Sequence, residues 1–200
     1  LQNGGVQWMT AGRGVVHSEM PEQEEGVMEG FQLWLNLPSY QKMCTPAYLD
    51  IQSDSIPEYQ FNGSIKVRVI SGESNGVSGA VLRPPELFAT NPLYLDIHFE
   101  NDACFEQTLN PLHNAFLFVY RGHVSVVSDS NKTSVGLHRM AILQNEGNGV
   151  VIEGSRGAKV LLIAGQPLNE PIAQHGPFVM NTREELIQAV DDFRSGLFNS

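Results

Sequence analysis

The chain has 200 residues, of which 42% are hydrophobic and 17% are charged, so it can bury a sizeable core and is not expected to be disordered. Its 12 Lys and Arg against 22 Asp and Glu give a formal net charge of −10, which repels phosphate backbones and anionic membranes. The composition argues against direct binding to nucleic acid and leaves a protein partner open, and no apolar run is long enough to span a bilayer.

The cysteines and the first residue bear on where the protein works. Cys44 and Cys104 are far apart in sequence and indicate no disulfide framework, which favours a reduced, cytoplasmic compartment, or a nuclear one in a eukaryote. The sequence opens at Leu1 rather than Met. We therefore expect a fragment, a processed product or an incompletely recorded sequence.

The first expected elements are two short strands joined by a glycine-containing turn, over Val6–Met9, Gly12–Gly14 and Val15–Glu19. Alternate residues of a strand face the same side, so His17 and Glu19 can both reach one metal ion. An imidazole nitrogen and a carboxylate oxygen form a mixed donor set that suits Fe(II), Mn(II) or Zn(II). A His-x-Glu triplet also arises by chance and fits the solvent-facing side of a half-buried strand, so spacing alone leaves both interpretations open.

The next apolar segment, Phe31–Leu37, alternates strictly and predicts a half-buried strand. Its inward face would carry Phe31, Leu33, Leu35 and Leu37. Trp34 falls on the opposite face, where packing between sheets is the simpler role and lining a pocket the other. The proline-containing segment 46–59 has no sustained period, so we expect it to link two domains.

Beyond this linker, short strands recur at regular spacing. They are predicted over Ile65–Ile70, over Leu93–Glu100, on both sides of Gly122 within Asn114–Val127, and as a hairpin over Val150–Ile163. Such spacing is typical of an all-β sandwich or barrel.

The histidines of this region do not form a second ligand set. His98 and Glu100 repeat the His-x-Glu spacing, but they share with Tyr94 and Asp96 the face of their strand that is expected to meet solvent. The remaining histidines do not pair with one another at ligand spacing; they are His113, His123, His138 and His175. We expect solvated or hydrogen-bonded imidazoles there and a second domain without metal.

The chain ends in its one convincing helix. Thr182 and Glu185 form a capping box at its start, and Gly196 follows as its stop. Its apolar face carries Leu186, Ile187, Val190 and Phe193. We expect this helix to pack on the outside of a sheet.

Five segments carry a more distinctive pattern: Gln7–Gly14, His17–Pro21, Gln32–Pro38, Gly165–Pro171 and Gly176–Thr182. Together they closely resemble the pirin family. The resemblance implies a bicupin, two β-barrel-like sandwiches, of which the first holds iron through three histidines and one glutamate. By position it makes His17 the third histidine ligand and Glu19 the glutamate. The family's other two histidines lie in an upstream His-Pro-His-Arg-Gly segment, which does not occur in this sequence.

A physical argument independent of that resemblance also predicts an incomplete first barrel. Residues 1–45 offer only about three short strands, which cannot close a barrel and leave edge groups unpaired. We therefore expect an all-β bicupin in which residues 1–45 are the C-terminal part of a truncated, metal-binding first barrel; a strand swapped from a second chain is the alternative. The linker 46–59, a second barrel over 60–180 and a C-terminal helix over 181–200 complete this prediction.

The resemblance implies an iron-dependent dioxygenase of the quercetin 2,3-dioxygenase type, which cleaves a flavonol ring with O₂ and releases CO. His17 would be a ligand only, whereas Glu19 would bind the metal and accept the flavonol hydroxyl proton. Fe(II) is the expected cofactor, with Mn, Ni, Cu or Zn as alternatives, and a chain lacking the other ligands would leave the site empty. The rival interpretation is a redox-sensing, iron-binding co-regulator that contacts a transcription factor without turnover, and the third is a cupin remnant without a site.

Overall fold

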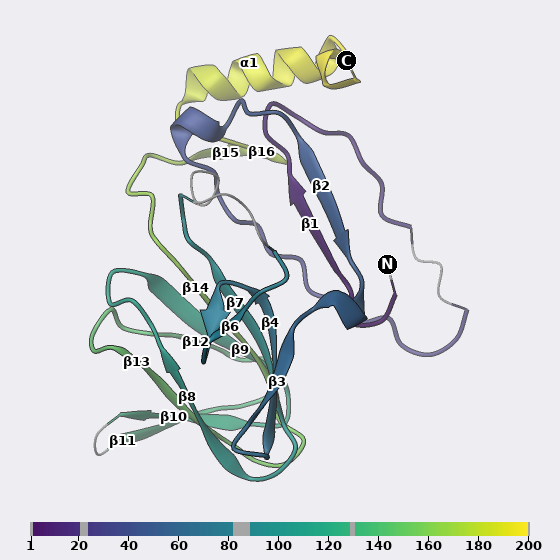
Figure 1. The fold of residues 1–200 in the computed structure, drawn as a ribbon. Helices are drawn as coiled ribbons and strands as arrows, with labels where there is room; N and C mark the ends of the chain where they lie inside the picture. Colours follow the sequence, from purple (N-terminus) through teal and green to yellow (C-terminus); the bar gives the residue numbers. More distant parts are fainter. Residues whose placement is uncertain (1, 21–23, 82–88, 129–130, 200) are drawn as a thin grey trace. The chain divides into compact units, whose positions relative to one another are not determined.

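The computed structural model describes residues 2–20, 24–81, 89–128 and 131–199, and Figure 1 shows it as a ribbon. The chain divides into two compact units. The sandwich unit comprises Leu1–Trp8 and Asp50–Pro167, and the smaller unit comprises Met9–Leu49 and Leu168–Ser200. Each unit is therefore built from two separate stretches of the chain.

The sandwich unit contains two antiparallel sheets (Figure 1). The larger sheet has the order β12-β9-β14-β7-β4-β3, with the bounds Met140–Ile142, Asn114–Arg121, Lys159–Gly165, Leu93–Phe99, Ile65–Ser71 and Glu58–Phe61. The other sheet has the order β11-β10-β13-β8, with the bounds Asn131–Val135, Val124–Ser128, Gly149–Gly154 and Ala103–Thr108. A short hairpin of β5 (Glu73–Ser74) and β6 (Val77–Ser78) follows β4. The expected all-β fold with a C-terminal helix is confirmed.

The core of the sandwich unit is formed by the facing sides of the two sheets. Val67, Leu95 and Leu162 of the larger sheet and Phe105 and Ile152 of the smaller sheet all have 0% exposure. This burial follows from the alternation of apolar residues along each strand, which puts every second side chain on the inner face.

The hairpin expected over Val150–Ile163 is wrong in its pairing, although both of its strands exist. β13 pairs with β8 and β10, whereas β14 pairs with β7 and β9. The turn between them carries the chain from one sheet to the other. Gly154 is required beside this turn because an added Cβ would lie 2.5 Å from the Phe99 ring. Sequence spacing shows that a turn exists, but not which sheet the second strand joins.

The outer face of β7 does not meet solvent as expected. Asp96 is only 9% exposed, and Tyr94 and His98 are half-buried, whereas Glu100 is exposed. Part of the cover is a second apolar cluster that packs on Tyr94 and contains Val6, Trp8, Ile51, Ile56, Ile70, Ala80 and Val81. Much of this cover comes from parts of the chain that are distant in sequence, so the alternation within β7 could not reveal it.

In the smaller unit, a hairpin of β15 (Ala173–His175) and β16 (Phe178–Met180) is followed by α1 (Arg183–Arg194), which packs on both strands. The capping box is confirmed, because Thr182 Oγ1 accepts a hydrogen bond from Glu185 N–H at 3.2 Å and Glu185 Oε2 accepts one from Thr182 N–H at 2.9 Å. The Phe193 ring packs edge-on against Phe178, with centroids 6.0 Å apart. A 3-10 helix, Leu197–Asn199, follows α1.

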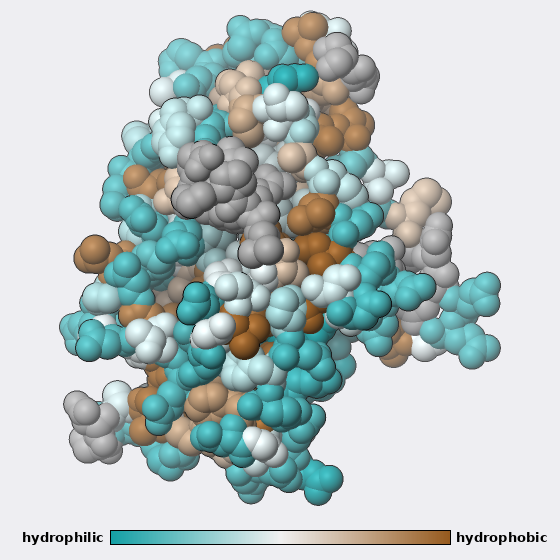
Figure 2. All heavy atoms as spheres, viewed as in Figure 1, coloured by the Kyte–Doolittle hydropathy of each residue, from teal (hydrophilic) through white to brown (hydrophobic). Residues whose placement is uncertain are grey.

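Two strands expected in the smaller unit are wrong. Val15–Glu19 and Phe31–Leu37 have no regular secondary structure, and Trp34 is 59% exposed rather than packed between sheets. A strand needs a neighbour for its backbone N–H and C=O groups, and none of the described strands pairs with either segment. Three of the four side chains assigned to an inward face are accordingly exposed by 41–45%, namely Phe31, Leu33 and Leu35, and Leu37 is half-buried. Figure 2 shows hydrophobic residues exposed between hydrophilic ones on one face of the molecule.

The segment expected to be a linker, residues 46–59, contains β2 (Ala47–Ile51) and a 3-10 helix, Ser53–Ser55. β2 pairs with β1 (Val6–Thr10), which confirms the first expected strand. Another 3-10 helix, Ser39–Gln41, precedes β2. The domain limits expected from the sequence stay a prediction. No described helix has the length and apolar character needed to cross a membrane.

Candidate functional site

A turn that only glycine can form precedes the two candidate ligands. Gly12 adopts φ 51°, and an added Cβ would lie 2.1 Å from the carbonyl oxygen of Cys44. The same oxygen accepts a hydrogen bond from Arg13 N–H at 2.9 Å. Any side chain at position 12 would therefore both strain the backbone and displace the carbonyl that holds the turn.

The second glycine of this turn is equally constrained. Gly14 adopts φ 136°, and an added Cβ would lie 2.7 Å from the ring of Phe198. Its N–H donates to the carbonyl oxygen of Ala11 at 3.0 Å. The two glycines thus fix the course of the chain three residues before His17.

His17 and Glu19 lie beyond this turn as exposed side chains on a segment without regular secondary structure. The strand that was expected to turn both toward one side is not formed, so strand geometry does not bring them together. Both residues are accessible to a ligand. Their assignment as metal ligands stays a prediction.

The described residues match an iron site in donor type but not in number. Among them, no group of three or more His, Cys, Asp or Glu side chains lies close enough to hold a metal ion. The set expected from the sequence, three histidines and one glutamate, needs two more imidazoles than this pair supplies. His17 and Glu19 supply one donor of each kind, so the described chain provides part of such a set and no complete one.

A polar hub in the smaller unit ties the segment before β2 to the C-terminal segment. Lys42 is only 5% exposed, and its Nζ donates to Asn36 Oδ1 at 2.8 Å and to the carbonyl oxygen of Val179 at 3.1 Å. Burial lowers the pKa of Lys42, while the charges of Glu170 and Glu185 act in the opposite direction.

Glu170 is the second centre of this hub. Its Oε2 accepts hydrogen bonds from Ser39 N–H at 2.8 Å and from Asn181 Nδ2 at 3.0 Å. The hydrogen bond from the Ser39 backbone is the main reason why the pKa of Glu170 lies below its ordinary value. Segments that stood out in the sequence, Gly165–Pro171 and Gly176–Thr182, therefore have a structural role at this hub.

Comparison with known proteins identifies the family of this chain. The Pirin family model matches residues 1–35, and the Pirin C-terminal cupin domain model matches residues 94–199. A pirin-like protein of Caulobacter vibrioides is 45% identical over 196 residues, which make up 98% of this chain and 68% of that protein. The chain belongs to the pirin family. Pirin of Homo sapiens is 41% identical over 197 residues, covering 98% of this chain and 65% of that protein.

The similarity extends from sequence to three-dimensional structure. The crystal structure of quercetin 2,3-dioxygenase from Acinetobacter baumannii superposes with a TM-score of 0.86 at 34% identity, covering 100% of this chain and 68% of that chain. The two-sheet architecture described above is therefore a cupin fold. His17 and Glu19 lie in the part of this pirin-family chain that the Pirin model matches.

The sandwich unit also holds a polar cluster that sequence reasoning missed. Asp96 Oδ1 accepts a hydrogen bond from Tyr120 Oη at 2.7 Å and lies 2.9 Å from His98 Nε2. Arg68 Nη1 lies 3.8 Å from Asp96 Oδ2, and Arg68 Nη2 donates to the carbonyl oxygen of Gly4 at 2.8 Å. The cluster therefore joins β4, β7 and β9 of the larger sheet and fastens the N-terminal segment to that sheet.

These contacts favour the ionised form of the Asp96 carboxyl group. Burial alone would raise the pKa of this carboxyl, but the hydrogen bond and charge of His98, the hydroxyl of Tyr120 and the charge of Arg68 outweigh burial and lower it. A sequence signal did exist, because Arg68 and Asp96 are direct partners in the β4–β7 register. Finding it required knowledge of that pairing.

Proposed function

We propose that this chain forms part of an iron-dependent dioxygenase of the quercetin 2,3-dioxygenase type, which opens a flavonol ring with O₂ and releases CO. The observation that carries the proposal is the likeness to quercetin 2,3-dioxygenase from Acinetobacter baumannii over 100% of this chain. The glycine-fixed turn before His17 and Glu19 supports it, because it fixes the chain ahead of an exposed nitrogen and oxygen donor.

In this proposal His17 is a ligand through an imidazole nitrogen. Glu19 is a ligand through one carboxylate oxygen and accepts the proton of the flavonol hydroxyl on the other, which requires an accessible carboxylate. Iron, when bound, would supply open coordination positions for O₂ and the flavonol. The other ligands would come from outside the described residues, since the described part of the chain contains no third ligand beside this pair.

The first test is elemental analysis of iron per chain on protein purified without added metal, followed by quercetin turnover with detection of CO. We expect about one iron per chain in protein whose ligand set is complete. His17→Ala and Glu19→Gln should each lose that iron. Glu24→Gln and His175→Ala are matched controls at exposed positions and should retain iron.

The outcomes separate the alternatives. Iron with quercetin turnover supports the dioxygenase. Iron without turnover, with binding to a protein partner that changes between ferrous and ferric protein, would establish the co-regulator instead. Protein of this length that takes up no iron under anaerobic loading would show that His17 and Glu19 do not hold the metal here.

A further inference from the structure

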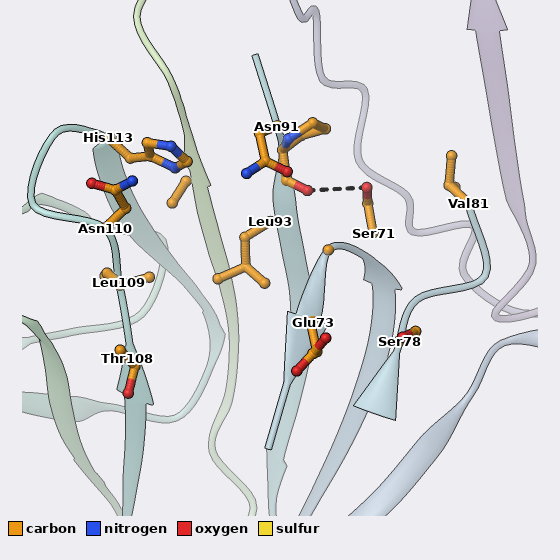
Figure 3. Close-up of a pocket in the computed structure, with 13 residues that line it drawn as sticks. Ser71, Glu73, Ser78, Val81, Asn91, Leu93, Thr108, Leu109, Asn110 and His113 are labelled. Atoms are coloured by element: carbon orange, nitrogen blue, oxygen red, sulfur yellow. Dashed lines mark hydrogen bonds between the residues drawn. The ribbon is translucent and has the colours of Figure 1, made fainter. Parts of the chain in front are cut away.

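The sandwich unit has a cavity of about 680 Å³ at one end of its two sheets. It lies where β4, β8 and β14 end and β7 and β9 begin (Figure 3). Leu93 and Ala164 of the apolar core are among its lining residues and form its floor. Its volume lies within the range that is typical of small-molecule sites. It belongs wholly to the sandwich unit and includes neither His17 nor Glu19.

One wall of the cavity is a preorganised turn. The N–H of Leu112 donates to Asn110 Oδ1 at 2.9 Å, and the N–H of His113 donates to the carbonyl oxygen of Asn110 at 2.9 Å. The side-chain oxygen of Asn110 is thereby used, which leaves its amide –NH₂ as a donor. Burial lowers the pKa of His113, so its imidazole is neutral near pH 7 and offers one donor and one acceptor.

The opposite wall supplies a hydrogen-bond acceptor. Figure 3 shows Glu73 and His113 on different sides of the cavity, with Leu93 between them. Gly72 lets the chain turn closely over this floor, because it adopts φ 81° and an added Cβ would lie 3.0 Å from Leu93 Cα. The cavity therefore offers hydrogen bonds from two walls above an apolar surface.

The charge of the lining restricts the ligand. Glu73 is the one charged side chain among the described lining residues, and these include no Lys or Arg. An anionic ligand in the cavity would be repelled by this carboxylate, and no Lys or Arg of the described lining would offset the repulsion. A neutral molecule meets acceptors, donors and an apolar floor.

We infer that this cavity binds a neutral, hydroxylated ring compound, whose hydroxyl groups contact His113, Asn110 and Glu73 while one face of the ring lies on Leu93. A pyranose sugar and a polyphenol share this chemistry, and binding at this site requires no iron.

The test uses the full chain, stripped of metal with EDTA, titrated with glucose, glucuronate and quercetin by isothermal calorimetry and ligand-observed NMR near pH 7, where His113 is neutral. We expect the neutral ring compounds to bind in preference to glucuronate. His113→Ala and Glu73→Gln should each weaken binding about 3- to 10-fold, which corresponds to one lost hydrogen bond. His123→Ala and Glu146→Gln, at exposed positions outside the cavity, are the controls and should bind as the unmodified chain does.

Glucose binding identifies a saturated ring and quercetin binding an aromatic one; either supports the inference. Glucuronate binding as tightly as glucose, no binding of any probe at several millimolar, or affinities unchanged in both cavity variants would overturn it. Glu73→Gln keeps the shape of an exposed side chain, so it remains informative if His113→Ala disturbs the turn. Repeating the titration in His17→Ala separates this site from the proposed iron site, because the inference requires unchanged binding there.

Discussion

The sandwich unit and the smaller unit differ in how far their apolar residues are buried. In the sandwich unit, alternating segments become strands because each finds a neighbour, and side chains such as Leu95 and Phe105 are fully buried. In the smaller unit, the equally regular Phe31–Leu37 finds no neighbour among the described strands, and Leu35 remains 43% exposed. The comparison shows that an alternating pattern becomes a strand only where backbone pairing is available.

The largest expected effect is on the free energy of unfolding, and it should differ between a leucine of the sandwich unit and a leucine of the smaller unit. Leu95→Ala should lower the free energy of unfolding by about 2–5 kcal/mol, because it removes a fully buried side chain and leaves a cavity. Leu35→Ala is the matched control and should change it by no more than about 0.5 kcal/mol. Urea unfolding followed by circular dichroism measures both. Equal effects would show that Leu35 is buried in solution and would remove the contrast.

A smaller effect, dependent on pH, is expected at Asp96. Because its pKa is lower in the folded state, its carboxylate stabilises the fold above the unfolded pKa of about 3.9, and this contribution is lost as the pH falls through the folded value. Asp96→Asn should cost about 1–3 kcal/mol at neutral pH. It should also flatten the loss of stability in acid.

The measurement for Asp96 is the free energy of unfolding from urea titrations at a series of pH values between neutral and acid. Asp191→Asn, at an exposed position in the smaller unit, is the control and should keep the slope of the unmodified chain. An acid slope that is unchanged in Asp96→Asn would contradict the role of the cluster around Arg68 and Tyr120.

The smallest expected effect tests the smaller unit alone. Thr182→Ala removes the side-chain oxygen that accepts from Glu185 N–H, and loss of such a cap costs about 1 kcal/mol. Amide hydrogen exchange should speed up within α1 and stay unchanged in β7 and β14. Thr45→Ala, an exposed threonine outside the helix, is the control. Faster exchange in both units would mean that they unfold together.

Local patterns predicted much of this fold. The alternation after Leu93 and the capping box before the helix at Thr182 are patterns within a few residues, and the structure has both the strand and the helix. The burial of Asp96 could not be predicted, because Arg68 and Tyr120 reach it from strands 28 and 24 residues away. The sheet exchange at Gly154 was likewise a matter of long-range pairing.

The candidate site divides in the same way. Gly12 and Gly14 stood out as a turn, and the structure gives the reason in the Cys44 carbonyl and the Phe198 ring, which are 32 and 184 residues further along the chain. His17 and Glu19 were chosen on donor chemistry and family resemblance. Their shared orientation rested on a strand that is not formed, so their joint action depends on partners that local sequence cannot reveal.

The hydrogen bond between Ser39 and Glu170 spans 131 residues of sequence and has a consequence for synthesis of the chain. Residues 9–49 leave the ribosome before the sandwich, yet their partners in the smaller unit, residues 168–200, leave it after the sandwich. The intervening sandwich can fold in the meantime and shorten the effective loop that this contact must close. A stop codon just after residue 167 would therefore also affect residues 9–49, because it would remove the residues of the smaller unit against which they pack.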